Sequence, residues 1–227
     1  MRGRFITFEG GEGAGKSTQA AMLALRLEAL GLEVLLTREP GGSPGAEIIR
    51  HVLLSGAAKP FGPDAEAMLF AAARDDHVRC TIAPALAASK WVVCDRFADS
   101  TRVYQGALGR VDPRLIKGLE RVSIGDLAPD LTLVLDVPVE RAMKRSAARR
   151  GTAEPDRFEA EGRDFHERLR DAFRELAAAE PDRCVVIDAT GSKQATAKQI
   201  WDTVQPRLDP AAAASAGHDP ASRDLVS

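Results

Sequence analysis

Five short segments of the chain are almost entirely apolar and give the strongest structural signal in the sequence. They are rich in valine, leucine and isoleucine, and they do not alternate apolar with polar residues. Such runs are typical of parallel strands that other elements cover on both faces. We therefore predict a parallel sheet built from these segments. They are Arg4–Glu9, Glu33–Thr37, Trp91–Asp95, Leu131–Asp136 and Cys184–Asp188.

The intervals between these strands are long enough for helices. Thr18–Leu30 is rich in alanine and leucine and is followed by a glycine suited to end a helix. The next helix begins with a capping serine and a proline, and its spacing places Ile48, Val52 and Leu53 toward the core. Because strands and helices alternate, the predicted fold class is a three-layer α/β sandwich. Three further helices are predicted from near Asp64 past Arg74, over Phe165–Leu176, and from Ser192 through Val204.

The composition changes near the C-terminus. Residues 1–208 have the pattern of one folded domain, whereas Asp209–Ser227 holds few large apolar residues. Such a segment buries too little surface to offset the entropy of ordering it, so we predict a disordered tail at 209–227. The alternative is a short alanine-rich helix that caps the domain.

The charges of the 227 residues nearly balance, with 31 Lys plus Arg against 33 Asp plus Glu. This balance argues against a protein that coats nucleic acid or an acidic membrane. The sequence has no apolar run long enough to span a membrane and no secretory signal pattern. The three cysteines include no C-x-x-C pair, which argues against a structural zinc site. We expect a soluble protein of a reducing cytoplasm.

The segment between the first strand and the first helix matches the phosphate-binding pattern G-x-x-x-x-G-K-[ST] in full. Glycines allow backbone N–H groups to surround an anion, and the start of the helix adds positive potential. A lysine that reaches the outer phosphates and a hydroxyl for Mg²⁺ complete the site. We therefore predict a nucleoside triphosphate site rather than an ordinary glycine-rich turn. It consists of Gly10, Gly11, Glu12, Gly13, Ala14, Gly15, Lys16 and Ser17.

Glu12 is an unusual residue for this loop, because its carboxylate would repel a triphosphate. We predict that the side chain faces a hydroxyl or another donor of a second ligand instead. The alternative is a solvated glutamate at the tip of the loop.

A second motif follows the third predicted strand. The strand ends at Asp95, where a carboxylate can hold Mg²⁺ directly or through a water molecule, and the adjacent Arg96 can bind an acceptor phosphate. An Asp–Arg pair is common by chance and carries little weight alone. The chain contains no asparagine, so the N-K-x-D element of guanine-specific switch proteins is absent.

Taken together, several motifs resemble those of bacterial thymidylate kinases. They are FITFEGGEGAGKST, TREPGGS, EAMLFAAAR, CDRFADSTRVYQG and PDLTLVLDV, and they occur in the family's order through about residue 205. The resemblance implies a nucleoside-monophosphate-kinase fold with a five-stranded parallel sheet. It also implies Mg²⁺–ATP as the phosphoryl donor, dTMP as the acceptor, and usually a homodimer.

The resemblance also assigns an acceptor site. Positions matching Phe70 and Arg74 stack on thymine and contact its O4, although Phe70 in the core and Arg74 in solvent would be the simpler interpretation. Positions matching the helical face of Thr101, Tyr104 and Gln105 contact the base and crowd the sugar; Thr101 replaces the Ser or Asn of some members. Arg50 matches an arginine that helps Arg96 to hold the acceptor phosphate, and the alternative is an exposed helix charge. Glu39 is predicted to line the same pocket, and the alternative is a structural role.

A basic stretch follows the fourth predicted strand. Residues 141–150 contain five basic residues and no acid, and the stretch continues to a flexible break near Pro155. A solvated helix end is the usual interpretation of such a run. The alternative is a mobile lid over approximately 145–158 that brings arginine to the transferring phosphoryl group. Because the loop carries Gly13 and Ala14, the chain resembles the class without a loop arginine, and the lid candidates are Arg149 and Arg150.

These residues predict a direct, in-line phosphoryl transfer that forms dTDP for the synthesis of dTTP. A phosphate monoester is largely a dianion at neutral pH, so no general base is needed. Catalysis then depends on positioning and on charge neutralisation by Lys16, Arg96, Mg²⁺ and the lid arginines. Two alternatives stay open, namely a monophosphate kinase for another base and a non-enzymatic ATP-dependent switch.

Overall fold

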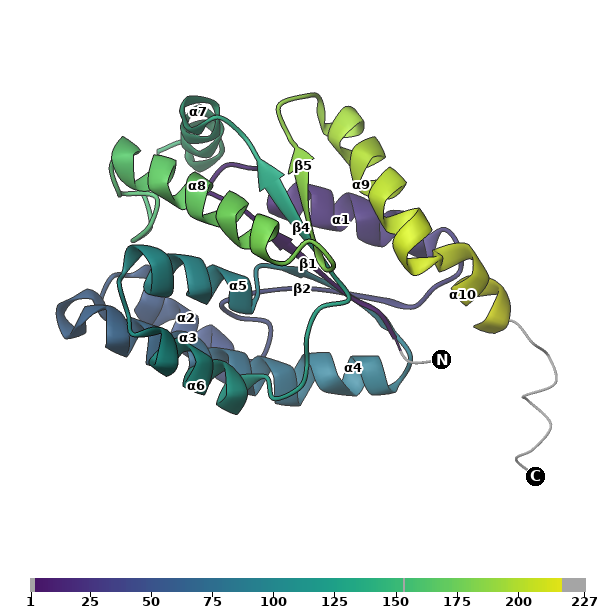
Figure 1. Cartoon of the computed structure of the whole chain (residues 1–227), viewed down its shortest axis with the longest axis horizontal. Coiled ribbons are helices and arrows are strands. Elements are labelled where there is room, and N and C mark those ends of the chain that lie inside the picture. The colour runs from purple at the N-terminus through teal and green to yellow at the C-terminus, as the bar shows by residue number, and fades with distance from the viewer. Residues whose placement is uncertain (1–2, 153, 218–227) are drawn as a thin grey trace.

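The computed structural model of the chain describes residues 3–152 and 154–217. Its centre is a five-stranded parallel sheet in the order β2-β3-β1-β4-β5 (Figure 1). Three strands have the predicted bounds, and the other two differ from the prediction by one residue at one or both ends. The strands are β1 (Phe5–Glu9), β2 (Val34–Arg38), β3 (Trp91–Asp95), β4 (Leu131–Asp136) and β5 (Cys184–Asp188).

Helices cover both faces of the sheet, so the predicted three-layer α/β sandwich is confirmed (Figure 1). The five predicted helices are present, and shorter helices occupy the intervals between them. One of these, η3 (Arg102–Leu108), is π-helical and continues α5. The helices are α1 (Lys16–Glu28), α2 (Pro44–Leu54), α3 (Gly62–His77), α4 (Ala83–Ala87), α5 (Ala98–Thr101), α6 (Pro113–Ser123), α7 (Val139–Arg150), α8 (Arg163–Ala179), α9 (Lys193–Leu208) and α10 (Pro210–Gly217).

Each strand sends alternate side chains to opposite faces of the sheet. Ile6 and Phe8 of β1 pack on α1 and α9, whereas Phe5 packs on the other face with Phe97 and Ile82. Because both faces are covered, the strands are apolar throughout, which explains the continuous runs in the sequence. The carboxyl ends of β1 and β3 lie side by side, so the loops after them share one edge of the sheet.

The prediction for the apolar face of α2 was wrong at two positions. Leu53 is buried, but Ile48 is 72% exposed and Val52 is 41% exposed. Helix α2 packs mainly on α3, and its Ile48 and Val52 point away from the sheet. The helical period shows that these apolar residues share one side of the helix, but it does not show which of them contact the core.

The prediction of a disordered tail was wrong for residues 210–217, which form α10. Alanine has the highest helix propensity, and Asp209 begins the helix by accepting a hydrogen bond from the Ala212 amide at 3.2 Å. Ala213 packs on the core cluster of α1 and α9. Residues 218–227 of the predicted tail, together with residues 1, 2 and 153, lie outside the described residues. No helix in the described part of the chain is long and apolar enough to cross a membrane.

Candidate active site

The loop between β1 and α1 depends on glycines for its shape. Gly10, Gly13 and Gly15 have φ angles of 127°, 72° and 98°, in the left-handed region that favours glycine. A Cβ atom on Gly13 would lie 2.0 Å from the Ala142 carbonyl oxygen, and one on Gly10 would lie 2.6 Å from that of Leu135. The loop is therefore packed against α7 and β4 with no room for a side chain at these two positions.

Lys16 closes the loop from inside. Its Nζ atom donates to the carbonyl oxygens of Gly10 at 3.0 Å and Gly11 at 2.8 Å. The residue is only 6% exposed, and burial lowers the pKa of Lys16. A buried ammonium with carbonyl partners only is ready to exchange one of them for a phosphate oxygen.

Arg96 joins the phosphate loop to the segment after β3. Its Nη1 atom donates to the carbonyl oxygen of Gly10 and to Ser100 Oγ, both at 3.1 Å. Its Nη2 atom donates to Glu12 Oε1 at 2.5 Å and to the Tyr104 hydroxyl at 3.0 Å. The guanidinium is therefore held in one position by three segments of the chain.

Glu12 points away from the interior of the phosphate loop. Its Oε1 atom accepts hydrogen bonds from Arg96 and, at 3.0 Å, from the Tyr104 hydroxyl. Burial opposes ionisation, but the positive charges of Arg96 and Lys16 prevail and lower the pKa of Glu12 to about 2. The alternative of a solvated loop-tip glutamate does not describe this residue, whose side chain is 18% exposed.

A cavity of about 300 Å³ extends from the phosphate loop toward α2 and α3. Its walls bring together residues from six separate parts of the chain. Thr101 Oγ1 is buried at this wall and has no hydrogen-bond partner among the described residues, which leaves it available to a ligand. Predicted acceptor-site residues in the lining are Glu12, Glu39, Arg50, Phe70, Arg96, Thr101, Tyr104 and Gln105.

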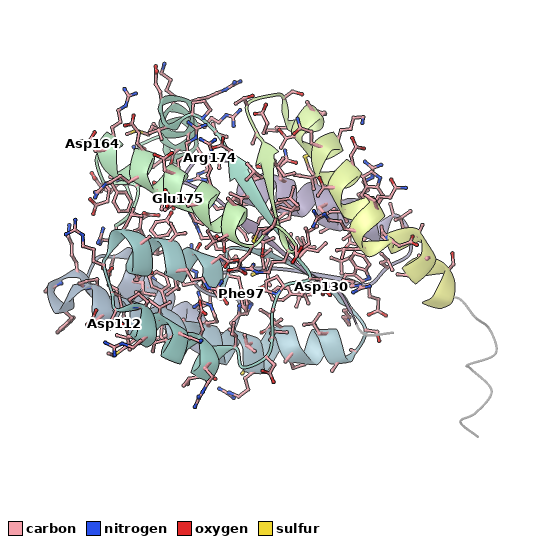
Figure 2. The ribbon with its side chains drawn as sticks, in the orientation of Figure 1. Phe97, Asp112, Asp130, Asp164, Arg174 and Glu175 are labelled. Atoms are coloured by element: carbon pink, nitrogen blue, oxygen red, sulfur yellow. The ribbon has the colours of Figure 1, made fainter. Side chains whose placement is uncertain are left out.

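Arg74 is the predicted acceptor-site residue that does not line this cavity. Its Nε atom donates to Glu39 Oε2 at 2.8 Å and its Nη2 atom donates to the Phe97 carbonyl oxygen at 3.2 Å. The guanidinium lies 5.6 Å from the ring of Phe97, which Figure 2 shows in the middle of the molecule. At 2% exposure Arg74 is not in solvent, and Glu39 stands between it and the cavity.

A second cavity, of about 520 Å³, lies on the other side of the phosphate loop, between α7 and the loop that leads to α9. Gly13, Gly15 and Thr18 form one side of it, and Arg145 and Arg149 of α7 form another. Arg145 donates to the Ala189 carbonyl oxygen at 3.1 Å and so ties α7 to the loop after β5. The phosphate loop therefore separates two cavities, as a site for two ligands requires.

The predicted lid corresponds to the second half of α7 and the segment that follows it. Glu159 holds both candidate arginines, with Arg149 Nη2 at 2.6 Å and Arg150 Nη1 at 3.3 Å from its carboxylate oxygens. The Arg149 side chain is 61% exposed and lines both cavities beside the phosphate loop. Arg150 is 25% exposed and lines a different cavity, between α7 and α8. The two arginines are therefore not equivalent.

Comparison with known proteins agrees with this arrangement. The family model described as thymidylate kinase matches residues 8–200. The chain belongs to the thymidylate kinase family. It is 63% identical to a thymidylate kinase of a Bradyrhizobium species, over 94% of this chain and 95% of that protein. It is 62% identical to the thymidylate kinase of Nitrobacter winogradskyi, over 95% and 94% of the two chains.

Solved structures give the same family. The crystal structure of thymidylate kinase from Ehrlichia chaffeensis matches with a TM-score of 0.73 and 33% sequence identity. The match covers 90% of this chain and all of that one. The expected thymidylate kinase fold with its five-stranded parallel sheet is thereby confirmed.

Two parts of this thymidylate kinase site escaped the sequence reasoning. Phe158 lies at the end of the predicted lid and lines the 300 Å³ cavity with the predicted acceptor-site residues (the acceptor cavity). Its ring is 5.1 Å from that of Tyr104 and 6.1 Å from that of Phe70. Arg157 ties the same segment to α3 through Glu66 at 3.3 Å. The string Asp156-Arg157-Phe158 was the available signal, since an aromatic residue beside a break is unusual in a solvated loop. The second cavity had no such signal, because backbone and small residues form most of it.

The residues predicted to hold a metal ion fit a magnesium site. Ser17 Oγ donates to Asp95 Oδ2, and Asp95 Oδ1 is buried without a hydrogen-bond partner among the described residues. A hydroxyl and a carboxylate are oxygen ligands of the kind that Mg²⁺ prefers. A buried carboxylate oxygen without a donor is an acceptor that a metal ion or its water would satisfy.

Proposed function

We propose that the chain transfers the γ-phosphoryl group of ATP to the 5′-phosphate of dTMP, forming dTDP and ADP in the synthesis of dTTP. One observation carries the proposal beyond family membership. The phosphate loop has a cavity on each side, and Arg96 lies at the boundary between the loop and the acceptor cavity. Two ligands bound in these cavities would meet where Lys16 and Arg96 supply positive charge.

In the proposed complex, the triphosphate of ATP occupies the loop Gly10–Ser17, and the donor nucleoside extends into the second cavity. Lys16 leaves one of its carbonyl partners and binds the outer phosphates. Ser17 and Asp95 would hold Mg²⁺, which supplies charge neutralisation on the β- and γ-phosphates. The dTMP ring stacks on Phe70, and Thr101 and Gln105 meet its polar edge.

Arg74 keeps the proposed role that the resemblance implies, the contact with O4 of thymine, although it does not itself line the cavity. Its Nε atom is bound to Glu39, which itself lines the cavity. We propose that the Arg74–Glu39 pair forms the end of the base pocket, and that Arg74 contacts O4 of thymine from there. Arg50, whose Nη1 donates to the Pro40 carbonyl oxygen, is proposed to turn to the acceptor phosphate together with Arg96.

Among the lid arginines, Arg149 is the proposed catalytic residue. It lines both cavities beside the loop, and its exposed side chain is free to move once its bond with Glu159 breaks. Arg150 faces the cavity between α7 and α8, and its proposed role is to hold Glu159. Closure of the lid would exclude water, which would otherwise accept the phosphoryl group.

The proposed assembly is a cytoplasmic homodimer. Ile48 and Val52 on α2 and Met68 on α3 are between 41% and 72% exposed, and the two helices pack against each other. An exposed apolar patch of this kind is typical of a protein–protein interface. A second copy of the chain would bury it.

The decisive test is ADP release, coupled to a spectroscopic assay, with Mg²⁺–ATP and a panel of dTMP, dUMP, dCMP, AMP and GMP. We expect dTMP to be the best acceptor and dUMP, which lacks one methyl group, to lose about 10–200-fold in kcat/KM. The amino group of cytosine would face the Arg74 donor, so dCMP should be several powers of ten poorer. Equal turnover of dCMP would refute the role of Arg74. Nucleotide binding without acceptor-stimulated ADP release would favour an ATP-dependent switch.

A further inference from the structure

Glu9 is a buried carboxylate that the proposed reaction does not use. It is the last residue of β1, is 0% exposed, and does not line the cavities beside the phosphate loop. Its Oε1 atom accepts hydrogen bonds from the backbone amides of Phe97 at 2.8 Å and Ser100 at 3.3 Å. Its Oε2 atom accepts one from Ser100 Oγ at 2.7 Å. All three bonds come from the segment after β3 and from the α5 helix that it leads into.

This segment carries Arg96 in an unusual backbone conformation. The φ angle of Arg96 is 70°, in the left-handed region that a residue with a side chain adopts only where its surroundings fix it. The surroundings are Glu9 on one side and the phosphate loop on the other. Ser100 links Glu9 to the Arg96 side chain, because its Oγ atom donates to Glu9 and accepts from Arg96 Nη1 at 3.1 Å.

An ionised Glu9 satisfies all three donors that surround it. The single proton of the Ser100 hydroxyl then binds Glu9, and its oxygen stays free to accept from Arg96. If Glu9 were protonated, its own O–H would point at Ser100 Oγ. The serine proton would then lose its acceptor and have to turn away from Glu9, and the serine oxygen would have to accept from both Glu9 and Arg96.

Both charge states of Glu9 are within reach near neutral pH. Burial and the neighbouring Asp99 carboxylate raise the pKa of Glu9 to about 7, against the opposing charge of Arg96. Asp99 is in turn held by Arg183, with two bonds of 2.7 Å, so its charge is fixed in place. The charged or titratable groups that interact with Glu9 from the surrounding elements are Lys16, Cys94, Arg96 and Asp99.

We propose that Glu9 is a positioning residue for phosphoryl transfer, which in its ionised form holds Ser100 as the acceptor that orients Arg96 toward the acceptor phosphate. The inference rests on the proposed function, in which Arg96 binds the phosphate of dTMP. It adds a residue that touches neither nucleotide and assigns part of the pH dependence of the reaction to it.

The test is the Glu9→Gln variant, which keeps the shape of the side chain and imitates its protonated form at every pH. We expect kcat/KM for dTMP to fall roughly 10–150-fold, the value of one hydrogen bond to a charged group, with KM for ATP nearly unchanged. In the wild type, kcat/KM should rise through two ionisations, that of dTMP near 6 and that of Glu9 at about 7. The variant should retain only the first.

Ser100→Ala provides a second, independent variant, which keeps the proposal testable if Glu9→Gln does not fold. Because Glu9 is proposed to act through Ser100, the variant that carries both substitutions should have about the same kcat/KM as the less active of the two single variants. The matched control is Glu120→Gln, which removes another carboxylate that binds this helical segment, through Arg102 at 2.5 Å. The control should keep the wild-type pH profile.

Three outcomes would count against the proposal. Losses that multiply in the double variant would show that Glu9 and Ser100 act separately. A Glu9→Gln variant with the full wild-type pH profile, and with kcat/KM lowered equally for dTMP and for ATP, would show a purely structural residue. A wild-type protein that released no ADP with dTMP would instead overturn the proposed function, and this inference with it.

Discussion

At the scale of single residues, the site contains an ion pair, Arg96 with Glu12, and a substrate that binds Arg96 also lies beside the carboxylate of Glu12. Arg96 and Glu12 are bound to each other and to the Tyr104 hydroxyl. The pKa of Glu12, lowered to about 2, keeps its carboxylate ionised at any physiological pH. A phosphate dianion that approaches Arg96 therefore meets a negative neighbour. Glu12 is a suitable partner for an uncharged donor of the same ligand, such as a sugar hydroxyl.

We predict that Glu12→Gln weakens the use of dTMP and leaves ATP binding nearly unchanged. The reason is that Glu12 faces the acceptor cavity and would accept a hydrogen bond from the 3′-hydroxyl of dTMP. A bond to a charged acceptor contributes about 1.5–3 kcal/mol, so kcat/KM for dTMP should fall roughly 10–150-fold. Steady-state kinetics with each substrate varied separately measures this split.

The control for this prediction is 3′-deoxy-dTMP. It should be a poor acceptor for the wild type, and the Glu12→Gln variant should use it no less well than the wild type does. If the losses from the variant and from the analogue multiplied, Glu12 and the 3′-hydroxyl would not be in contact. Tighter ATP binding by the variant would show that Glu12 repels the triphosphate instead.

At the scale of elements, α7 and the segment after it work as a unit. Glu159 accepts hydrogen bonds from Ser146 and Arg149 of α7, and Phe158 beside it forms part of the acceptor cavity. A ligand that moves Phe158 would thus act on the residue that holds Arg149. Phe158 and Glu159, which are adjacent in the chain, would thus couple the acceptor cavity to the proposed lid.

We predict that Arg149→Ala lowers kcat about 10³–10⁵-fold, the range known for arginine fingers, while KM for ATP changes little. Arg150→Ala should have a much smaller effect, because Arg150 lines neither of the two cavities that Arg149 lines, but a third one between α7, α8 and the phosphate loop. Single-turnover measurements separate the chemical step from product release. Arg149→Lys should restore only part of the rate, since an ammonium lacks the planar fork. A loss confined to ATP affinity would contradict a role in the transition state.

The sequence predicted the strands almost to the residue, because a sheet covered on both faces imposes long apolar runs that few other structures need. It predicted the position of the phosphate loop between β1 and α1, because that motif uses consecutive residues. It did not predict that Glu39 lies between Arg74 and the cavity, or that Phe158 lies beside Phe70. The first contact joins residues that are 35 positions apart in the chain, and the second joins residues that are 88 positions apart. Helical spacing, which relates residues three or four positions apart, cannot predict them.

At the scale of the whole molecule, the carboxylates of Glu9, at the end of β1, and of Glu12, in the phosphate loop, affect stability in opposite directions. The folded pKa of Glu12, about 2, lies below its ordinary 4.5, so its stabilisation is present above pH 4.5 and is lost as the pH falls toward 2. The folded pKa of Glu9, about 7, lies above 4.5, so folding becomes less favourable as the pH rises from 4.5 through 7. Stability should therefore be greatest in mildly acidic solution.

We predict that Glu9→Gln removes much of the decrease in Tm between pH 5.5 and 8. The whole rise of the Glu9 pKa corresponds to roughly 3–4 kcal/mol, since a change of one in pKa is worth about 1.4 kcal/mol, and only part of it falls between pH 5.5 and 8. Thermal unfolding of wild type and variant across this pH range measures the difference. Glu12→Gln, in contrast, should flatten the curve only below pH 4.5. A wild-type Tm that rises from pH 5.5 to 8 would refute the assignment of Glu9.

We also predict that Ile48→Asp separates a homodimer into monomers, because it places a charge in the apolar patch of α2. Size-exclusion chromatography with light scattering measures the mass directly. Leu25→Asp on α1, at a site 66% exposed in the free chain and on the other face of the sheet, is the matched control and should leave the mass unchanged. A wild-type protein that is monomeric at micromolar concentration would refute the dimer.

The close approach of Gly13 to α7 limits the routes by which such enzymes can diverge. An arginine at position 13 cannot be added alone, because its Cβ would have to displace the Ala142 carbonyl, and with it the helix that carries Arg149. Gly13→Arg alone would thus displace the proposed catalytic arginine and be harmful. Descendants of this chain would need a compensating change in α7 before the exchange became tolerable.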